Sequence, residues 1–523
     1  MSEAAKSGES GQSGDPGQSG DIAALARGGR TNFMGFLLRL LARLPFLFIA
    51  GQLYGAEAVG RFASALVVVE LLALVCSIGE KRGLAQRLAE NSDDPARLIA
   101  DGMLVALVLS GLAAAALFFV PAPLFPSGIY TELDRWIVLA IPGYALTEIV
   151  LAAQAYRFDI ATTVRARAVV EPWTISILAG VFFYLEPVSA SGLSMAYLAS
   201  IYAGLGVALW SYLRTYGPPR QWRPDPARIW RMTLRAVPLA VADAIEWGSR
   251  RLDLFILGFF AGPIAVGVYY MAQQVASLPQ KLKTSFEPIL GPVITARLKE
   301  KDYAAIARQV CQVGFWIVAA QAGIALALGI PGEALMGLFG PGGQFVPGTG
   351  ALAFLLAAEV VAATAVVSEA ALVYMARLRN LWVSIGMIAL QAVLTVGLML
   401  LVERIDFESA VRADYYRAAA AAAALMLALA TASVIKAVML GRILGHKINN
   451  WRWPLVWAAA AAVLVGQVAI LLPEWMELAF GIPAILAVYG WIIWTRGFGP
   501  EDRVLFRRSN KAAGPPDEGA KDC

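Results

Sequence analysis

Residues 43–60, RLPFLFIAGQLYGAEAVG, recur without a gap at residues 250–267 as RRLDLFILGFFAGPIAVG. Nine of the eighteen aligned positions are identical, and the offset is 207 residues. Six predicted helices separate the two copies, and because that number is even, both copies cross the bilayer in the same direction. The repeat therefore predicts two pseudo-symmetric six-helix bundles around a central cavity, related by an axis along the membrane normal.

The composition around this repeat is that of a membrane protein. Of 523 residues, 59% are hydrophobic and 15% are charged, and the mean hydropathy is +0.63. A helix needs about 20 apolar residues to cross a hydrocarbon core of about 30 Å. We therefore expect an all-α polytopic membrane protein of about 14 transmembrane helices. The expected segments are 33–54, 62–79, 99–121, 135–155, 168–185, 191–213, 234–260, 263–280, 310–330, 347–375, 381–402, 413–440, 453–472 and 477–495.

The distribution of Lys and Arg tests this series of helices, because short cytoplasmic loops carry an excess of positive charge. With the N-terminus inside, 34 of the 43 Lys and Arg residues fall on the cytoplasmic side, Arg167, Arg377 and Lys436 among them. A wrong helix count would destroy this alternation. The pattern predicts a multi-pass membrane protein with both termini in the cytoplasm.

These segments divide the chain into six parts. The Gly/Ser-rich start has no apolar stretch before a small-residue cleavage site, so we expect it to be a disordered tail and not a signal peptide. The two bundles account for most of the remaining length. The parts are a disordered cytoplasmic tail (1–30), an N-terminal six-helix bundle (31–215), a basic cytoplasmic linker (216–233), a C-terminal six-helix bundle (234–440), two additional transmembrane helices (441–495) and a cytoplasmic tail (496–523).

Arginines within the predicted helices are the first candidate site residues. A charge at the bilayer centre costs about 2.5–3.5 kcal/mol on insertion scales, so such groups usually face a polar cavity or a partner. Arg39 and Arg43 share one face of the first helix, and Arg250 and Arg251 lie on the seventh. Guanidinium groups match phosphate oxygens and stay charged. We interpret these four arginines as a pyrophosphate-binding set in the cavity.

Acidic residues near Arg250 offer a second interpretation. Asp243, Glu246 and Asp253 lie on the same side of the seventh helix and are candidates for coupling transport to Na⁺ or H⁺. Alternatively, Arg250 pairs with Glu246 or Asp253 and the cluster only locks helices together. Both interpretations remain open at this stage.

Several site classes are excluded by residue counts. The three cysteines have no paired spacing, and one histidine cannot form a His-cluster metal site. The run Gly340-Pro341-Gly342-Gly343 lacks a following Lys-Ser/Thr, so it is not a phosphate-binding loop. We therefore expect no catalytic residues, no metal and no cofactor apart from a coupling ion.

Three stretches resemble one known family. They are LPFLFIAGQLYGAEAVGRFASA (44–65), LAAQAYRFD (151–159) and DLFILGFFAGPIAVGVYYMAQQVASLP (253–279). They are similar to the polysaccharide-transport branch of the multidrug/oligosaccharidyl-lipid/polysaccharide exporter superfamily. The resemblance covers roughly residues 31–440.

This resemblance implies a function and partners. The protein would be a flippase that moves undecaprenyl-pyrophosphate-linked units of O-antigen, capsule or exopolysaccharide to the periplasmic leaflet by ion-coupled alternating access. Its partners would be lipid-linked oligosaccharide, membrane lipids and polysaccharide polymerase or glycosyltransferase machinery, with no nucleic acid.

Other functions compete with this one. A lipid II flippase would differ only in the glycan, and a multidrug or organic-cation exporter of the same superfamily would need an acidic pocket. A membrane glycosyltransferase or polymerase would need catalytic carboxylates and a sizeable external loop, but every predicted external loop is short. We therefore expect a transporter and not an enzyme.

Overall fold

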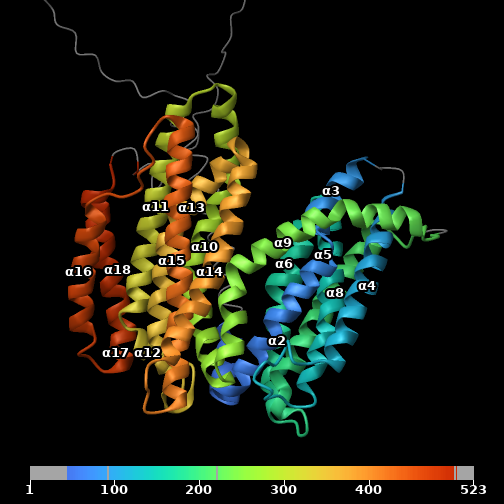
Figure 1. Ribbon diagram of the computed structural model, residues 1–523, viewed down its shortest axis with the longest axis horizontal. Coiled ribbons are helices and arrows are strands. Elements are labelled where there is room, and N and C mark those ends of the chain that lie inside the picture. The colour runs from blue at the N-terminus through green and yellow to red at the C-terminus, as the bar shows by residue number, and fades with distance from the viewer. Residues whose placement is uncertain (1–43, 91–93, 220–221, 500–501, 503–523) are drawn as a thin grey trace, which may run out of the picture.

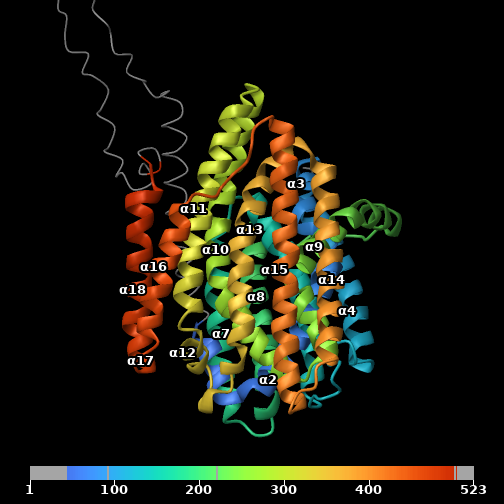
Figure 2. The same cartoon turned by 60° about the vertical axis from the view of Figure 1, so that its left-hand side comes forward.

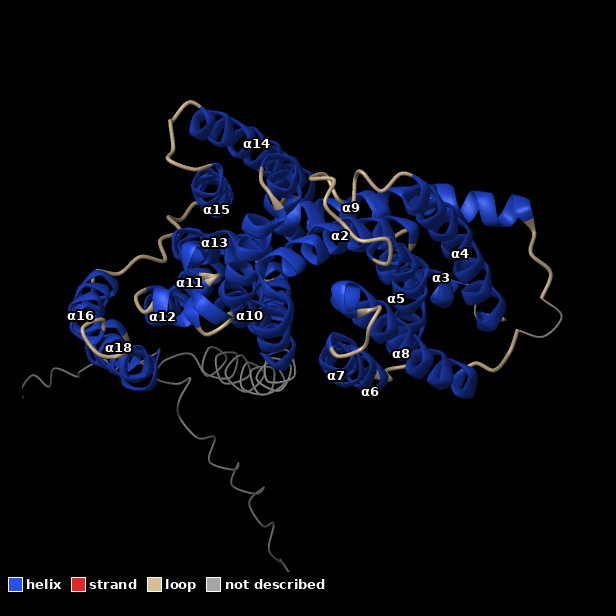
Figure 3. Ribbon diagram, turned by 90° about the horizontal axis from the view of Figure 1, so that it is seen from below, coloured by secondary structure: helices blue, strands red, loops and turns tan. Residues whose placement is uncertain are grey.

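The computed structural model describes residues 44–90, 94–219, 222–499 and 502, and these residues form helices and loops without a strand. Ten helical segments among them are long and apolar enough to cross a membrane. Seen from below, the helices form two groups joined near α2 and α9 (Figure 3). The expected all-α polytopic membrane fold is confirmed.

The N-terminal helices occupy the right-hand side of Figure 1. Most of them run between the upper and lower ends of the molecule, whereas the short α3 lies at the upper end. The helices are α2 (Gly55–Cys76), α3 (Glu80–Glu90), α4 (Pro95–Phe119), α5 (Ala140–Tyr156), α6 (Ile160–Val164), α7 (Glu171–Phe183) and α8 (Gly192–Thr215).

The second group begins with a long helix that connects the two sides. The first part of α9 contacts α3 and α4, and its last part contacts α14 and α15. The helix changes direction between these two parts (Figure 1). Pro238 lies inside α9, and a proline removes a helical hydrogen bond and bends a helix. The helices are α9 (Pro226–Phe260), α10 (Pro263–Lys299), α11 (Tyr303–Gly329), α12 (Gly332–Gly337), α13 (Thr349–Met375), α14 (Arg377–Glu403) and α15 (Ala410–Leu444).

A C-terminal hairpin completes the fold. It consists of α16 (Pro454–Ala469), α17 (Glu474–Met476) and α18 (Ile482–Ile492), and it packs against α11 (Figure 2). Its last described residue, Asp502, accepts hydrogen bonds from Trp316 Nε1 (2.8 Å) and Arg452 (2.7 Å). Burial alone would raise the pKa of Asp502, but the bonds from Arg452, the Gly499 amide and Trp316 outweigh it and lower the pKa. The anionic carboxylate thus ties the segment after α18 to Trp316 of α11.

Two helices begin with the same four residues, Asp-Pro-Ala-Arg. The Asp94 carboxylate accepts from the Arg97 amide (3.2 Å) at the start of α4, and the Asp225 carboxylate accepts from the Ala227 amide (2.9 Å) at the start of α9. Aspartate satisfies the free amides of a first turn, and proline at the first helical position has no amide to satisfy. The linker predicted at 216–233 therefore already contains the first two turns of α9.

The two copies of the repeat meet where α2 crosses α10. A Cβ atom on Gly60 would lie 1.7 Å from the Pro263 carbonyl oxygen, and one on Gly267 would lie 2.0 Å from the Ala56 carbonyl oxygen. Gly60 and Gly267 are equivalent repeat positions, and so are Ala56 and Pro263. The contact is therefore reciprocal, as it is at a two-fold interface. Only glycine permits so close an approach, so the repeat predicted from the sequence also forms the junction of the two bundles.

The helices found differ from the expected fourteen for identifiable reasons. The expected segments 33–54 and 62–79 appear as one helical run, Leu44–Cys76, which Gly55 interrupts with φ 78° and ψ 176°. α9 and α10 correspond to the seventh and eighth segments but are not among the ten apolar spans, and α16 is a shorter apolar helix. α10 also continues to Lys299, so much of the basic stretch expected in a loop is helical. The tail expected at 1–30 lies outside the described residues, as does nearly all of the C-terminal tail.

Candidate functional site

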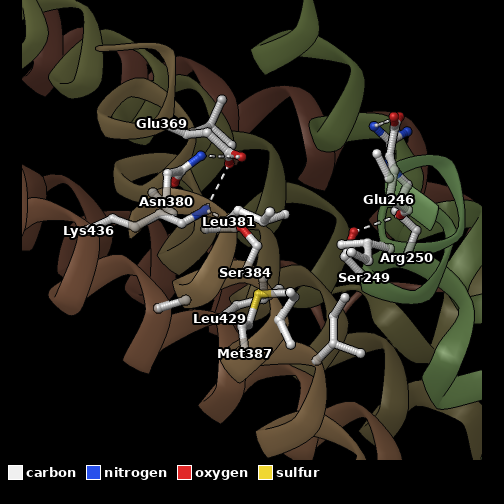
Figure 4. A pocket seen from close by; sticks show the side chains of 18 of the residues that line it. Glu246, Ser249, Arg250, Glu369, Asn380, Leu381, Ser384, Met387, Leu429 and Lys436 are labelled. Atoms are coloured by element: carbon white, nitrogen blue, oxygen red, sulfur yellow. Dashed lines mark hydrogen bonds and ion pairs between the residues drawn. The ribbon is translucent and has the colours of Figure 1, made fainter. Parts of the chain in front are cut away.

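A cavity of about 1230 Å³ lies within the C-terminal bundle, between α9, α10, α13, α14 and α15. Its wall is mostly apolar, and Figure 4 shows two clusters of charged and polar side chains on it. One cluster lies on α9 and the other is shared by α13, α14 and α15. Drug-sized ligands usually occupy about 300–1,000 Å³, so this space suits a larger molecule.

The α9 cluster consists of Glu246, Ser249 and Arg250. The Arg250 guanidinium donates to Glu246 at 3.2 Å, and their side chains are 48% and 38% exposed. The pairing expected at i−4 is therefore present. An ion pair this exposed contributes only about 0–1 kcal/mol, so it does not explain why the charges are kept at the cavity wall.

Arg251 lines the same cavity but links three helices. Its guanidinium lies 3.6 Å from the Glu70 carboxylate on α2 and donates to Gln273 Oε1 on α10 at 2.7 Å. Arg251 therefore connects the N-terminal bundle to the C-terminal one. The two neighbouring arginines, which the sequence suggested as one set, differ in environment.

The three acidic candidates are separated by the fold. Asp253 is fully buried and accepts hydrogen bonds from the Tyr269 hydroxyl and from Gln273 Nε2 (3.3 Å). Asp243 is also buried, and neither residue lines the cavity. Glu246 alone among the three lines it. The structure thus does not bring Asp243, Glu246 and Asp253 together at one exposed site.

Arg39 and Arg43 lie outside the described residues, so the structure does not place them. The equivalence of Arg43 to Arg250 rests on the repeat in the sequence. The contribution of Arg39 and Arg43 to the cavity stays a prediction.

The second cluster in the cavity was not recognised from the sequence. The Lys436 ammonium of α15 donates to Glu369 of α13 (2.9 Å) and to Ser384 of α14 (3.3 Å), and Asn380 of α14 donates to Glu369 (3.4 Å). Lys436 lies inside α15 and is only 4% exposed. Its position follows the buried, alanine-rich face of α15 at spacings of four residues. That periodicity is the signal that would have located it.

The N-terminal bundle contains a different kind of charged cluster. Arg167 donates to Glu148 (2.5 Å) and Glu171 (3.0 Å), and its guanidinium lies 4.3 Å from the centroid of the Tyr144 ring. None of these side chains lines the large cavity. This arginine is enclosed by two carboxylates and an aromatic ring, which is an arrangement that holds helices together.

A family model described as "polysaccharide biosynthesis protein" matches residues 25–295, which is just over half of the chain. The chain belongs to this family. The resemblance inferred from the sequence is thereby confirmed at the level of the family. No curated relative matches the sequence.

Solved structures with the same fold are transporters. A lipid II flippase, MurJ, in an inward closed conformation has 10% identity and a TM-score of 0.65 over 88% of this chain and 99% of its own. An inward-facing multidrug resistance MATE family transporter of the MOP superfamily has 15% identity and a TM-score of 0.62 over 78% and 94%. A MOP superfamily transporter from Pyrococcus furiosus has 16% identity and a TM-score of 0.52 over 82% and 96%. At 10–16% identity, these likenesses show that the chain has the same fold as these transporters.

Proposed function

We propose that the protein is a flippase for oligosaccharide linked to undecaprenyl pyrophosphate, supplying O-antigen, capsule or exopolysaccharide synthesis. The cavity in the C-terminal bundle is the observation that carries this proposal. Apolar walls suit a lipid, and charged groups at two places suit a headgroup with a phosphate end and a sugar end. The family match supports a role in polysaccharide biosynthesis.

The charges at the cavity favour an anionic substrate over an organic cation. Arg250, Arg251, Arg377 and Lys436 line it, against Glu246, Glu359 and Glu369. The lining residues therefore carry more positive than negative charges, and Arg39 and Arg43, if they also line the cavity as proposed, add to this positive charge. A multidrug exporter for cations would need the opposite balance. A lipid II flippase is compatible with these charges, because its substrate shares the pyrophosphate.

The proposed energy source is an ion gradient, with Na⁺ or H⁺ entering beside Glu246. This carboxylate lines the cavity next to Arg250, so binding of a cation there competes with the ion pair. A change at Glu246 thus alters the charge that the substrate meets. Asp243 and Asp253, being buried, are proposed only as supporting groups on the same helix.

Transport in proteoliposomes tests the function and its coupling. The probe is a fluorescent polyprenyl pyrophosphate carrying one N-acetylhexosamine, and translocation is read by a quencher that cannot cross the membrane. We expect the purified protein to speed translocation when a Na⁺ or H⁺ gradient is present and not after the gradient is collapsed. Translocation that persists without any gradient or membrane potential would exclude the coupling, and none under any gradient would exclude the function.

The proposed location is the bacterial inner membrane with cytoplasmic termini. The loops near residues 300 and 445 lie at the upper end of the molecule, and those near 188 and 340 lie at the lower end (Figure 1). Reporters fused at 300 and 445 should register in the cytoplasm, and those at 188 and 340 in the periplasm. A periplasmic signal at 300 would contradict this orientation.

A further inference from the structure

A polar cluster in the cavity consists of Lys436, Glu369, Asn380 and Ser384. It contains an amide and a hydroxyl in addition to the ion pair between Lys436 and Glu369. Lys436 and Asn380 are 4% and 6% exposed, and all four residues line the cavity. They come from three helices, α13, α14 and α15. The cluster is thus a built part of the cavity wall and not a surface feature.

The hydrogen bonds within this cluster leave one acceptor unused. Lys436 donates to Glu369 and Ser384, and the Asn380 amide nitrogen donates to Glu369. The Asn380 Oδ1 atom is buried at the cavity wall and has no hydrogen-bond partner. A buried polar atom without a partner is costly, so its presence at a cavity points to a ligand that supplies the missing donor.

The charge of the cluster selects the class of that ligand. The ammonium of Lys436 offsets the carboxylate of Glu369, so the cluster is close to neutral. A phosphate oxygen only accepts hydrogen bonds and cannot satisfy Asn380 Oδ1, and it would also be repelled by Glu369. A hydroxyl group both donates and accepts. The cluster therefore fits a neutral sugar and not a phosphate.

The position of the cluster agrees with this assignment. Figure 4 shows it on the opposite side of the cavity from Glu246 and Arg250, with the apolar side chain of Leu381 beside it and those of Met387 and Leu429 below Ser384 in this view. We propose that Lys436, Glu369, Asn380 and Ser384 form a subsite for the sugar next to the pyrophosphate, which binds at the α9 cluster. This assignment rests on the proposed function and adds a separate place for the sugar.

The test compares two lipids that differ only in the sugar. The probes are a short-chain polyprenyl pyrophosphate and the same lipid carrying one N-acetylhexosamine, and their dissociation constants are measured for the purified full chain in detergent. The test variant is Asn380→Leu, which removes the unused acceptor and the hydrogen bond from Asn380 to Glu369 but leaves the Lys436–Glu369 ion pair. The matched control is Gln391→Leu, because Gln391 is also a buried amide of α14 without a hydrogen-bond partner, but it does not line the cavity.

The wild type should bind the sugar-bearing lipid more tightly. Asn380→Leu should reduce that preference by about three- to tenfold, the usual range for one neutral hydrogen bond, and leave binding of the sugar-free lipid unchanged. Ser384→Ala should act in the same direction, and Gln391→Leu should leave the preference intact.

Other outcomes would overturn the subsite. If the wild type binds both lipids equally, or if Asn380→Leu weakens both to the same extent or neither, the cluster does not recognise the sugar. In these cases the proposed function stands, because the pyrophosphate lipid still binds. If neither lipid binds the wild type, the subsite and the proposed function fail together.

Discussion

Arg167 in the N-terminal bundle and Arg250 in the C-terminal bundle both lie within the helical region, but their surroundings are opposite. Two carboxylates and the ring of Tyr144 enclose Arg167, whereas Arg250 forms an exposed ion pair with Glu246 and lines a cavity. An intramembrane arginine is thus either a structural link or a ligand group. The burial of the arginine and the number of its partners distinguish these two roles, whereas the residue type does not.

The largest effect on folding should follow from Arg167→Gln. This change leaves Glu148 and Glu171 without their shared cation. The three side chains are 21%, 15% and 14% exposed, and two ion pairs are lost at once, so the cost should exceed that of one pair of similar exposure and approach the cost of breaking a buried pair, about 3–5 kcal/mol. We expect low abundance in the membrane and a clearly lower Tm of the purified protein. The triple variant that also carries Glu148→Gln and Glu171→Gln should recover much of the abundance. Normal abundance of Arg167→Gln alone would show that the cluster is not structural.

An intermediate effect on folding is expected for Arg251→Gln, because Arg251 has features of a structural link and of a ligand group. It lines the cavity, yet its ion pair with Glu70 joins the two bundles across 3.6 Å. Both side chains are about one-fifth exposed, so the loss should be about 1–3 kcal/mol, between an exposed and a buried pair. The check is a double-mutant cycle with Glu70→Gln, read as Tm. Additive effects would exclude a coupling between these two residues.

The sequence predicted the helical class and the repeat because both depend on local patterns. Apolar length defines a span, and the matched glycines Gly60 and Gly267 are visible as a repeat before their contact is known. The partners of the charges were harder to predict. The sequence grouped Arg167 and Lys436 with the basic residues of one side, and it did not predict their ion pairs with carboxylates of other helices.

The reason is that pairing between helices depends on their relative rotation and depth, which one sequence does not contain. The i−4 pair of Arg250 with Glu246 was predictable because it lies within a single helix. Glu369, Asn380 and Lys436 come from three helices, and although Glu369 and Asn380 are only 11 residues apart, Lys436 is 67 residues from Glu369. Counting the charged residues in each loop does not predict that these three residues are in contact. The four-residue periodicity of the buried face of α15 does indicate that Lys436 is buried.

The smallest effect on folding, and a large one on transport, should come from Arg250. Its exposed pair with Glu246 contributes about 0–1 kcal/mol, so Arg250→Gln should leave membrane abundance and Tm nearly unchanged. Export should nevertheless fall in the order wild type, Arg250→Lys, Arg250→Gln, because lysine keeps the charge but loses the planar two-pronged contact with phosphate. Glycan export and membrane abundance are measured on the same cells. If Arg250 were only structural, abundance would fall with export, and Glu246→Gln would restore both. Normal export by Arg250→Gln at normal abundance would instead remove Arg250 from the pyrophosphate site, and the contrast with Arg167 would then be one of packing alone.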